Sequence, residues 1–132
     1  MSSRSHTILF VVRKVKCLGQ YITSKLCFID LAGSEKVKKS GAKGQTLEET
    51  KKINLSLSCL GNVVHSLTNG SDHIPYRNSK LTRILKDSLA ADTTTSIITT
   101  CSLERYDFNE TLSTIKFAVR AKKIKNKKKL EN

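Results

Sequence analysis

The chain of 132 residues is 38% hydrophobic and only 5% aromatic, so it is long enough for one domain with a real but lean core. Its 24 Lys and Arg residues against 11 Asp and Glu residues give a formal net charge of +13, which indicates a polyanionic partner: nucleic acid, an anionic membrane surface or an acidic protein surface. No apolar run is long enough to cross a bilayer, and we expect no secretory signal. The cysteines and histidines are scattered, so we expect no zinc site and free cysteine thiols in a reducing compartment.

The first elements are predicted to be two strands in an antiparallel hairpin. Residues 6–16 alternate loosely between apolar and polar positions, a short turn follows at residues 17–20, and residues 21–31 form the second strand. Residues 26–29 are apolar throughout, so we expect this part of the second strand to be buried on both faces.

An acidic residue, Asp30, ends this apolar run, and a small-residue turn containing Gly33 follows. Open α/β sheets bind their ligands at the carboxyl ends of strands. A carboxylate there can hold Mg²⁺ through a water molecule, and a glycine allows a backbone N–H to approach a phosphate closely. The same residues fit an ordinary buried strand with a glycine turn equally well, so the pattern is weak by itself.

A long helix is predicted after a polar loop at residues 36–44. It begins at Thr46, where Glu49 completes a capping-box pattern, and its apolar positions recur at three- and four-residue spacing along one stripe. Asn69 and Gly70 form a good stop signal. The stripe consists of Ile53, Leu57, Leu60, Val64 and Leu67.

Three further elements are predicted in the rest of the chain. Asn78 or Ser79 caps a second helix, residues 93–103 form a strand because they are rich in Thr and Ile, and Asn109 caps a last helix that runs into a basic stretch at residues 120–129. This order of strands and helices indicates part of an α/β layer fold. The inward positions are expected to be Leu81, Ile84, Leu85 and Leu89 in the second helix, and Leu112, Ile115, Ala118 and Val119 in the last.

Several stretches, in the same order and spacing, resemble the kinesin motor domain. Residues 2–6 (SSRSH) resemble the end of its first switch loop, and residues 30–35 (DLAGSE) resemble its second switch. Residues 53–63 are similar to its long switch helix, residues 73–85 to its microtubule-facing loop and helix, and residues 117–122 to the end of its last helix.

The resemblance implies a partial P-loop NTPase-type three-layer α/β/α motor domain. This is the C-terminal half, with an antiparallel hairpin, the switch helices, one further strand and a last helix. Residues 1–122 would belong to the motor domain, and residues 123–132 would form a basic tail similar to a neck linker. Because the other strands would lie upstream, the apolar faces of residues 8–12 and 26–31 should be left partly uncovered.

The resemblance also implies a site for ATP and Mg²⁺. Ser3 would be a Mg²⁺ ligand through its hydroxyl, and Ser2 would lie against the γ-phosphate. Asp30 would hold a Mg²⁺-bound water, and the backbone N–H of Gly33 would contact the γ-phosphate.

Two charged residues would complete this site. By the resemblance, Arg4 and Glu35 form the ion pair that closes the switches and positions the attacking water; by themselves they fit two unlinked surface charges equally well. The sequence contains no G-x-x-x-x-G-K-[ST] phosphate loop, so we expect no appreciable ATPase activity from this chain alone.

The resemblance also implies a partner for the basic residues, because microtubule surfaces are acidic. Arg77, Lys80 and Arg83 are spaced by three residues and can share one face, which the resemblance makes the tubulin contact, with Lys36 adding to it. The implied location is the cytoplasm, on the microtubule cytoskeleton. The alternative is a non-enzymatic basic module for tubulin or nucleic acid, in which residues 120–129 bind the polyanion.

Overall fold

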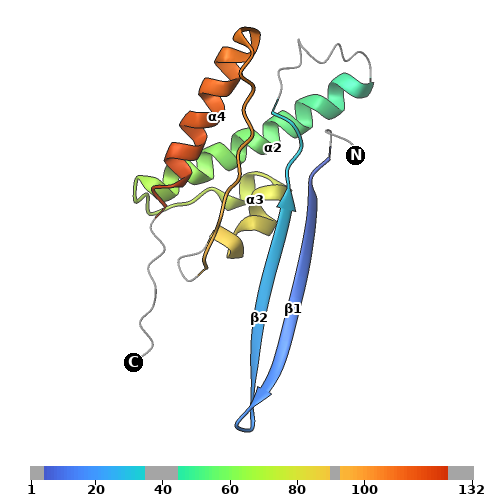
Figure 1. Cartoon of the computed structure of the whole chain (residues 1–132), viewed down its shortest axis with the longest axis vertical. Coiled ribbons are helices and arrows are strands. Elements are labelled where there is room, and N and C mark those ends of the chain that lie inside the picture. Colours follow the sequence, from blue (N-terminus) through green and yellow to red (C-terminus); the bar gives the residue numbers. More distant parts are fainter. Residues whose placement is uncertain (1–4, 35–44, 90–92, 125–132) are drawn as a thin grey trace.

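The computed structural model describes residues 5–34, 45–89 and 93–124, and shows a long hairpin projecting from a group of helices (Figure 1). The hairpin consists of β1 (Thr7–Cys17) and β2 (Gln20–Asp30). The helices are α2 (Gln45–Thr68), α3 (Lys80–Leu85) and α4 (Phe108–Ala121), with short 3₁₀ helices η1 (Tyr76–Asn78), η2 (Asp87–Leu89) and η3 (Arg105–Asp107). The predicted hairpin and helices are therefore confirmed.

The two strands pair in antiparallel register from Thr7 opposite Asp30 to Cys17 opposite Gln20. The turn between them has only two residues, Leu18 and Gly19, and both have positive φ, at 48° and 82°. Positive φ at both positions is the geometry of the type I′ turn, whose twist matches that of the strands. Each strand is displaced by one residue from its predicted bounds.

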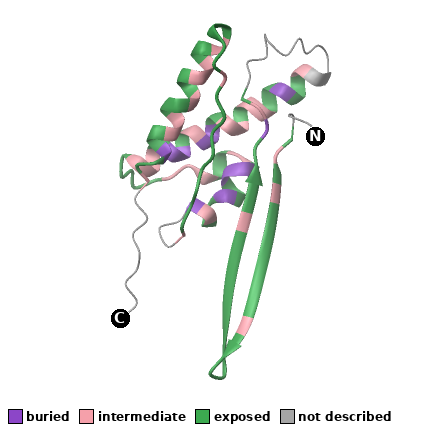
Figure 2. Ribbon diagram, viewed as in Figure 1, coloured by how far each residue is buried: buried purple, intermediate pink, exposed green. Residues whose placement is uncertain are grey.

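The apolar faces of the hairpin are exposed, which corrects the prediction of a strand buried on both faces. Leu9 is 57% exposed and Phe28, its cross-strand partner, is 55% exposed. Figure 2 shows most of the hairpin as exposed. The reason is that Ile8, at the base, is the hairpin residue that packs on the helical core of the described chain. The expectation that these faces would be left partly uncovered is confirmed.

The core lies where α2, α3 and α4 meet (Figure 1). The predicted stripe of α2 supplies Leu60 and Val64 to it. The helix ends at Thr68, and the positive φ of 67° at Gly70 just beyond it lets the Ser71 N–H donate to the Ser66 carbonyl at 3.1 Å. The helix starts at Gln45, so the predicted cap Thr46 lies inside it. The buried core residues are Leu60, Val63, Val64, Leu81, Leu85, Leu89 and Ala121.

The C-terminal third differs from its prediction in two respects. Residues 93–103 run as an irregular segment, since within the described chain only β1 and β2 form a sheet and no strand pairs with this segment. The last helix starts at Phe108, one residue before Asn109, and it packs through Phe117 and Ala121. Its predicted inward residues Ile115 and Val119 are 48% and 53% exposed, because no described element covers that side.

Among the described residues, no helix is both long enough and apolar enough to span a bilayer.

Candidate functional site

A histidine joins three segments of the chain at the base of the hairpin. The backbone N–H of Ala32, in the loop after β2, donates to His6 Nδ1 at 3.0 Å. The other ring nitrogen, His6 Nε2, lies 2.8 Å from the Ser56 hydroxyl oxygen in α2, across 50 residues of sequence. The Ser56 hydroxyl in turn donates to the Ile53 carbonyl at 2.7 Å. We call these four residues the His6 relay.

The donors and acceptors of the His6 relay define one protonation state. Because Nδ1 accepts a hydrogen bond, the proton of the neutral ring lies on Nε2, which then donates to Ser56. The Ser56 hydroxyl donates its own proton to the Ile53 carbonyl, so its oxygen lone pairs are left to accept a hydrogen bond from His6. Burial lowers the pKa of His6 from its ordinary value of 6.5, which favours this neutral ring.

The predicted nucleotide-site residues cluster beside the His6 relay where they are described. Asp30 is the last residue of β2 and is exposed opposite Thr7, so its carboxylate is open to a ligand. Gly33 follows Ala32 directly and is half-buried. An exposed carboxylate is an oxygen donor of the kind that Mg²⁺ prefers.

The remaining predicted residues of the nucleotide site lie outside the described ranges. They are Ser2, Ser3, Arg4 and Glu35. Within the described ranges, no three His, Cys, Asp or Glu side chains gather closely enough to hold a metal ion by themselves. The four cysteines are free thiols, as predicted.

A second candidate site is the basic face, which we define as Arg77, Lys80 and Arg83. All three side chains are exposed, and in the described part of the chain none of them forms an ion pair with an acidic residue. Their charge is therefore available to a partner. Lys36, predicted to add to this face, lies outside the described residues.

A buried threonine holds the two parts of the basic face together. Ser79 caps α3, as predicted: its hydroxyl accepts from the Thr82 N–H at 3.0 Å, while the Thr82 hydroxyl accepts from the Ser79 N–H at 3.2 Å. The Thr82 hydroxyl also donates to the Tyr76 carbonyl in η1 at 2.8 Å, and Thr82 is fully buried. Arg77 in η1 is thereby fixed relative to Lys80 and Arg83 in α3.

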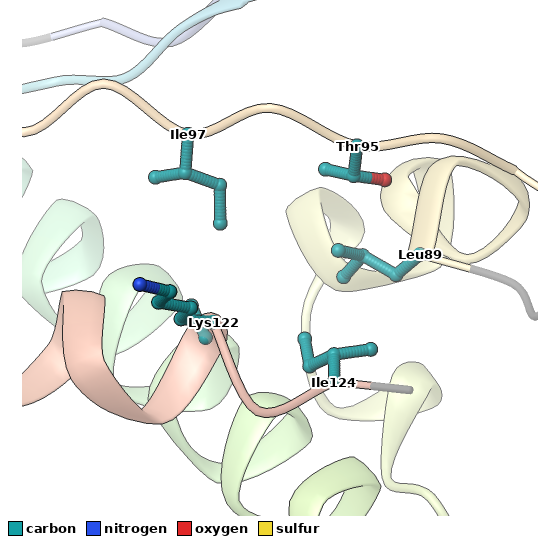
Figure 3. A pocket seen from close by; sticks show the side chains of 6 residues that line it. Leu89, Thr95, Ile97, Lys122 and Ile124 are labelled. Atoms are coloured by element: carbon teal, nitrogen blue, oxygen red, sulfur yellow. The ribbon is translucent and has the colours of Figure 1, made fainter. Parts of the chain in front are cut away.

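A small pocket of about 190 Å³ lies at the end of the described chain (Figure 3). Ile124 reaches it just beyond α4 and also packs against the core, so the chain after the last helix starts in contact with the helical group. The pocket is lined by Leu89, Thr95, Ile97, Ala121, Lys122 and Ile124.

The sequence alone did not reveal the roles of His6 and Ser56. Both fall within stretches that resemble family motifs, but no local pattern pairs two residues that are 50 positions apart. The available signal was the position of Ser56 beside Leu57 of the apolar stripe, because a half-buried hydroxyl needs a hydrogen-bond partner.

Residues 1–124 match the family model described as "Kinesin motor domain". The chain is 55% identical over 132 residues to the kinesin heavy chain of Botryotinia fuckeliana, covering 98% of this chain and 15% of that protein. It is 57% identical over 129 residues to kinesin-like protein 3 of Schizosaccharomyces pombe, covering 96% of this chain and 23% of that protein. The chain therefore spans less than a quarter of these relatives.

Solved structures give the same result. The structure of a fast kinesin has a TM-score of 0.84 and 54% identity, covering 97% of this chain and 37% of that one. A KIF14 dimer with AMP-PNP in complex with a microtubule has a TM-score of 0.86 and 38% identity, covering 98% of this chain and 38% of that one. These likenesses agree with the predicted α/β fold class.

Proposed function

The chain belongs to the kinesin motor-domain family, and we propose that it provides the γ-phosphate-sensing and microtubule-binding part of an ATP-driven microtubule motor. The observation that carries this proposal is the hydrogen bond from Ala32 to His6. It joins the SSRSH and DLAGSE stretches, which the family uses as its two switches, next to the exposed Asp30. We assign residues 1–122 to the motor domain and residues 123–132 to a neck-linker-like tail.

On the nucleotide side, the chain's own oxygen and N–H groups would hold ATP and Mg²⁺. The Ser3 hydroxyl and, through water, the Asp30 carboxylate would hold the metal, while Ser2 and the Gly33 N–H would contact the γ-phosphate. Mg²⁺ would supply charge neutralisation for the phosphates. The exposed carboxylate of Asp30, three residues before the half-buried Gly33, supports this arrangement.

Arg4 and Glu35 would pair to close the switches and orient the attacking water. The sequence has no G-x-x-x-x-G-K-[ST] loop to hold the other phosphates, so positioning would be incomplete in this chain alone. We therefore expect no microtubule-stimulated ATP hydrolysis by the 132-residue chain in a steady-state assay. A rate comparable to that of a complete motor would contradict this expectation.

On the microtubule side, the basic face would meet the acidic surface of tubulin, with Lys36 beside it. The change Arg77→Ala, Lys80→Ala, Arg83→Ala should weaken microtubule co-sedimentation about ten- to a hundredfold, at about 0.5–1 kcal/mol per charge. The loss should shrink as salt is raised, because exposed charges are screened.

A matched control removes the same charge elsewhere. Lys14, Lys16 and Lys25 are exposed on one face of the hairpin, and changing all three to Ala should leave the affinity within about threefold of the original. The proposed face would be wrong if the first variant pelleted like the unmodified chain while removal of residues 125–132 abolished binding. That outcome would favour the basic tail as the polyanion contact.

A further inference from the structure

We propose that His6 is a positioning residue that fixes the loop after β2 to helix α2, so that Asp30 and Gly33 keep a constant position relative to this helix. The inference rests on the proposed function and adds a route between its two sides. A displacement of the loop at the nucleotide would be carried to α2 by the two ring nitrogens of one side chain.

The first argument is connectivity. Ala32 and Ser56 lie 26 and 50 residues from His6 in sequence, yet each forms a hydrogen bond with one of its ring nitrogens. The loop and α2 are separated in the chain by residues 35–44, which the structure does not describe. In the described structure, the imidazole ring is thus a direct polar link between the two segments.

The second argument is that each of the two hydrogen bonds has a fixed donor and a fixed acceptor. Ala32 is buried, at 6% exposure, so its N–H depends on the Nδ1 acceptor rather than on water. The Ser56 hydroxyl is oriented by its bond to the Ile53 carbonyl, which leaves its lone pairs facing Nε2. Reversing the ring or moving its proton to Nδ1 would break the bond to Ala32, so the loop and the helix each favour the same tautomer.

The third argument is the position of the link. Ser56 lies on α2 four residues before Leu60, which is in the helical core, and the core also packs α3 of the basic face. Asp30 and Gly33 flank Ala32 within two residues on either side. The His6 relay therefore connects residues of the proposed nucleotide site to the helix that packs on the basic face.

The test uses Ser56→Ala in the full 132-residue chain, observed by NMR. This variant leaves His6 and the loop unaltered, and Ala at this position suits a helix. In the unmodified chain we expect a neutral His6 ring protonated on Nε2. Loss of the bond to Ser56 should accelerate amide hydrogen exchange at Ala32 about fivefold, which is the fold-change for a net hydrogen bond of about 1 kcal/mol. A merely local role of Ser56 would leave Ala32 exchange unchanged.

Two further variants separate the halves of the link. In His6→Asn the side-chain oxygen can still accept from Ala32 but the side chain no longer reaches Ser56, so Ala32 exchange should match that of Ser56→Ala. The exposed His65 of α2 is the control, and His65→Asn should leave Ala32 exchange unaltered. A ring protonated on Nδ1 in the unmodified chain, or Ala32 exchange unaffected by Ser56→Ala, would overturn the inference.

Microtubule co-sedimentation of the same variants separates this inference from the proposed function. If the unmodified chain fails to pellet with microtubules, the proposed function fails, while the NMR result still decides the role of His6. If the unmodified chain pellets and Ser56→Ala accelerates Ala32 exchange, both stand.

Discussion

At the residue scale, the neutral ring of His6 makes stability depend on pH. Burial holds the pKa of His6 below 6.5 in the folded chain, whereas the unfolded chain titrates near 6.5. Below about pH 6.5 the unfolded state therefore binds more protons, so this contribution to the free energy of unfolding falls as the pH drops and is constant above that value. Between about pH 7.5 and about pH 5.5, the free energy of unfolding measured by denaturant titration should fall less for His6→Asn than for the unmodified chain. An equal loss in both proteins would contradict this assignment.

Thr82 is a second residue whose single hydroxyl has a large expected effect. Thr82→Val keeps the shape but leaves the Tyr76 carbonyl without its donor at a fully buried position. We expect the free energy of unfolding to fall by about 1–3 kcal/mol, measured by denaturant titration. Thr68 makes a comparable bond to the His65 carbonyl at an exposed position, so Thr68→Val should cost less than about 0.5 kcal/mol. Equal losses of unfolding free energy in the two variants would show that burial does not determine the effect of removing the hydroxyl.

At the element scale, the turn of the hairpin holds a residue in an unfavourable backbone conformation. Leu18 has a φ of 48° and is fully exposed. Its left-handed backbone conformation therefore costs free energy that no side-chain packing offsets. Asn adopts this conformation more readily, and Asn-Gly is the preferred pair for this turn. Leu18→Asn should raise the free energy of unfolding by about 0.5–1 kcal/mol, measured by thermal unfolding. Leu18→Val should lower it, because a branched side chain is worse at positive φ.

The same elements show how far sequence patterns extend. The hairpin strands and α2 were predicted to within one residue at most of their boundaries, because alternation, the stop signal at Gly70 and helical spacing are local properties. The directions of their faces were less predictable: Ile115 was expected inward and is 48% exposed. Burial depends on which other elements are present, and that information is not local. The bond between His6 and Ser56 was unpredictable for the same reason.

At the scale of the whole molecule, the hairpin contributes an apolar surface without a cover in the described structure. Leu9, Val11, Leu26 and Phe28 lie on one face as two cross-strand pairs, and each is 46–57% exposed. Monomeric proteins seldom expose such contiguous apolar faces, which promote association. We therefore expect the 132-residue chain to self-associate through this face at micromolar concentrations.

The paired change Val11→Lys, Leu26→Glu tests this expectation without altering net charge. The two residues are direct cross-strand partners, so the opposite charges can support the hairpin while the apolar face is interrupted. Because a buried aliphatic side chain contributes about 1.5–3 kcal/mol, losing two at an interface should weaken association at least about tenfold in sedimentation velocity. The matched control Lys14→Thr, Thr23→Lys exchanges a cross-strand pair on the opposite face, again with no change in net charge, and should leave association unaffected. If both variants associate like the unmodified chain, the contact lies elsewhere, and the exposed side of α4 around Ile115 and Val119 becomes the surface that joins the copies.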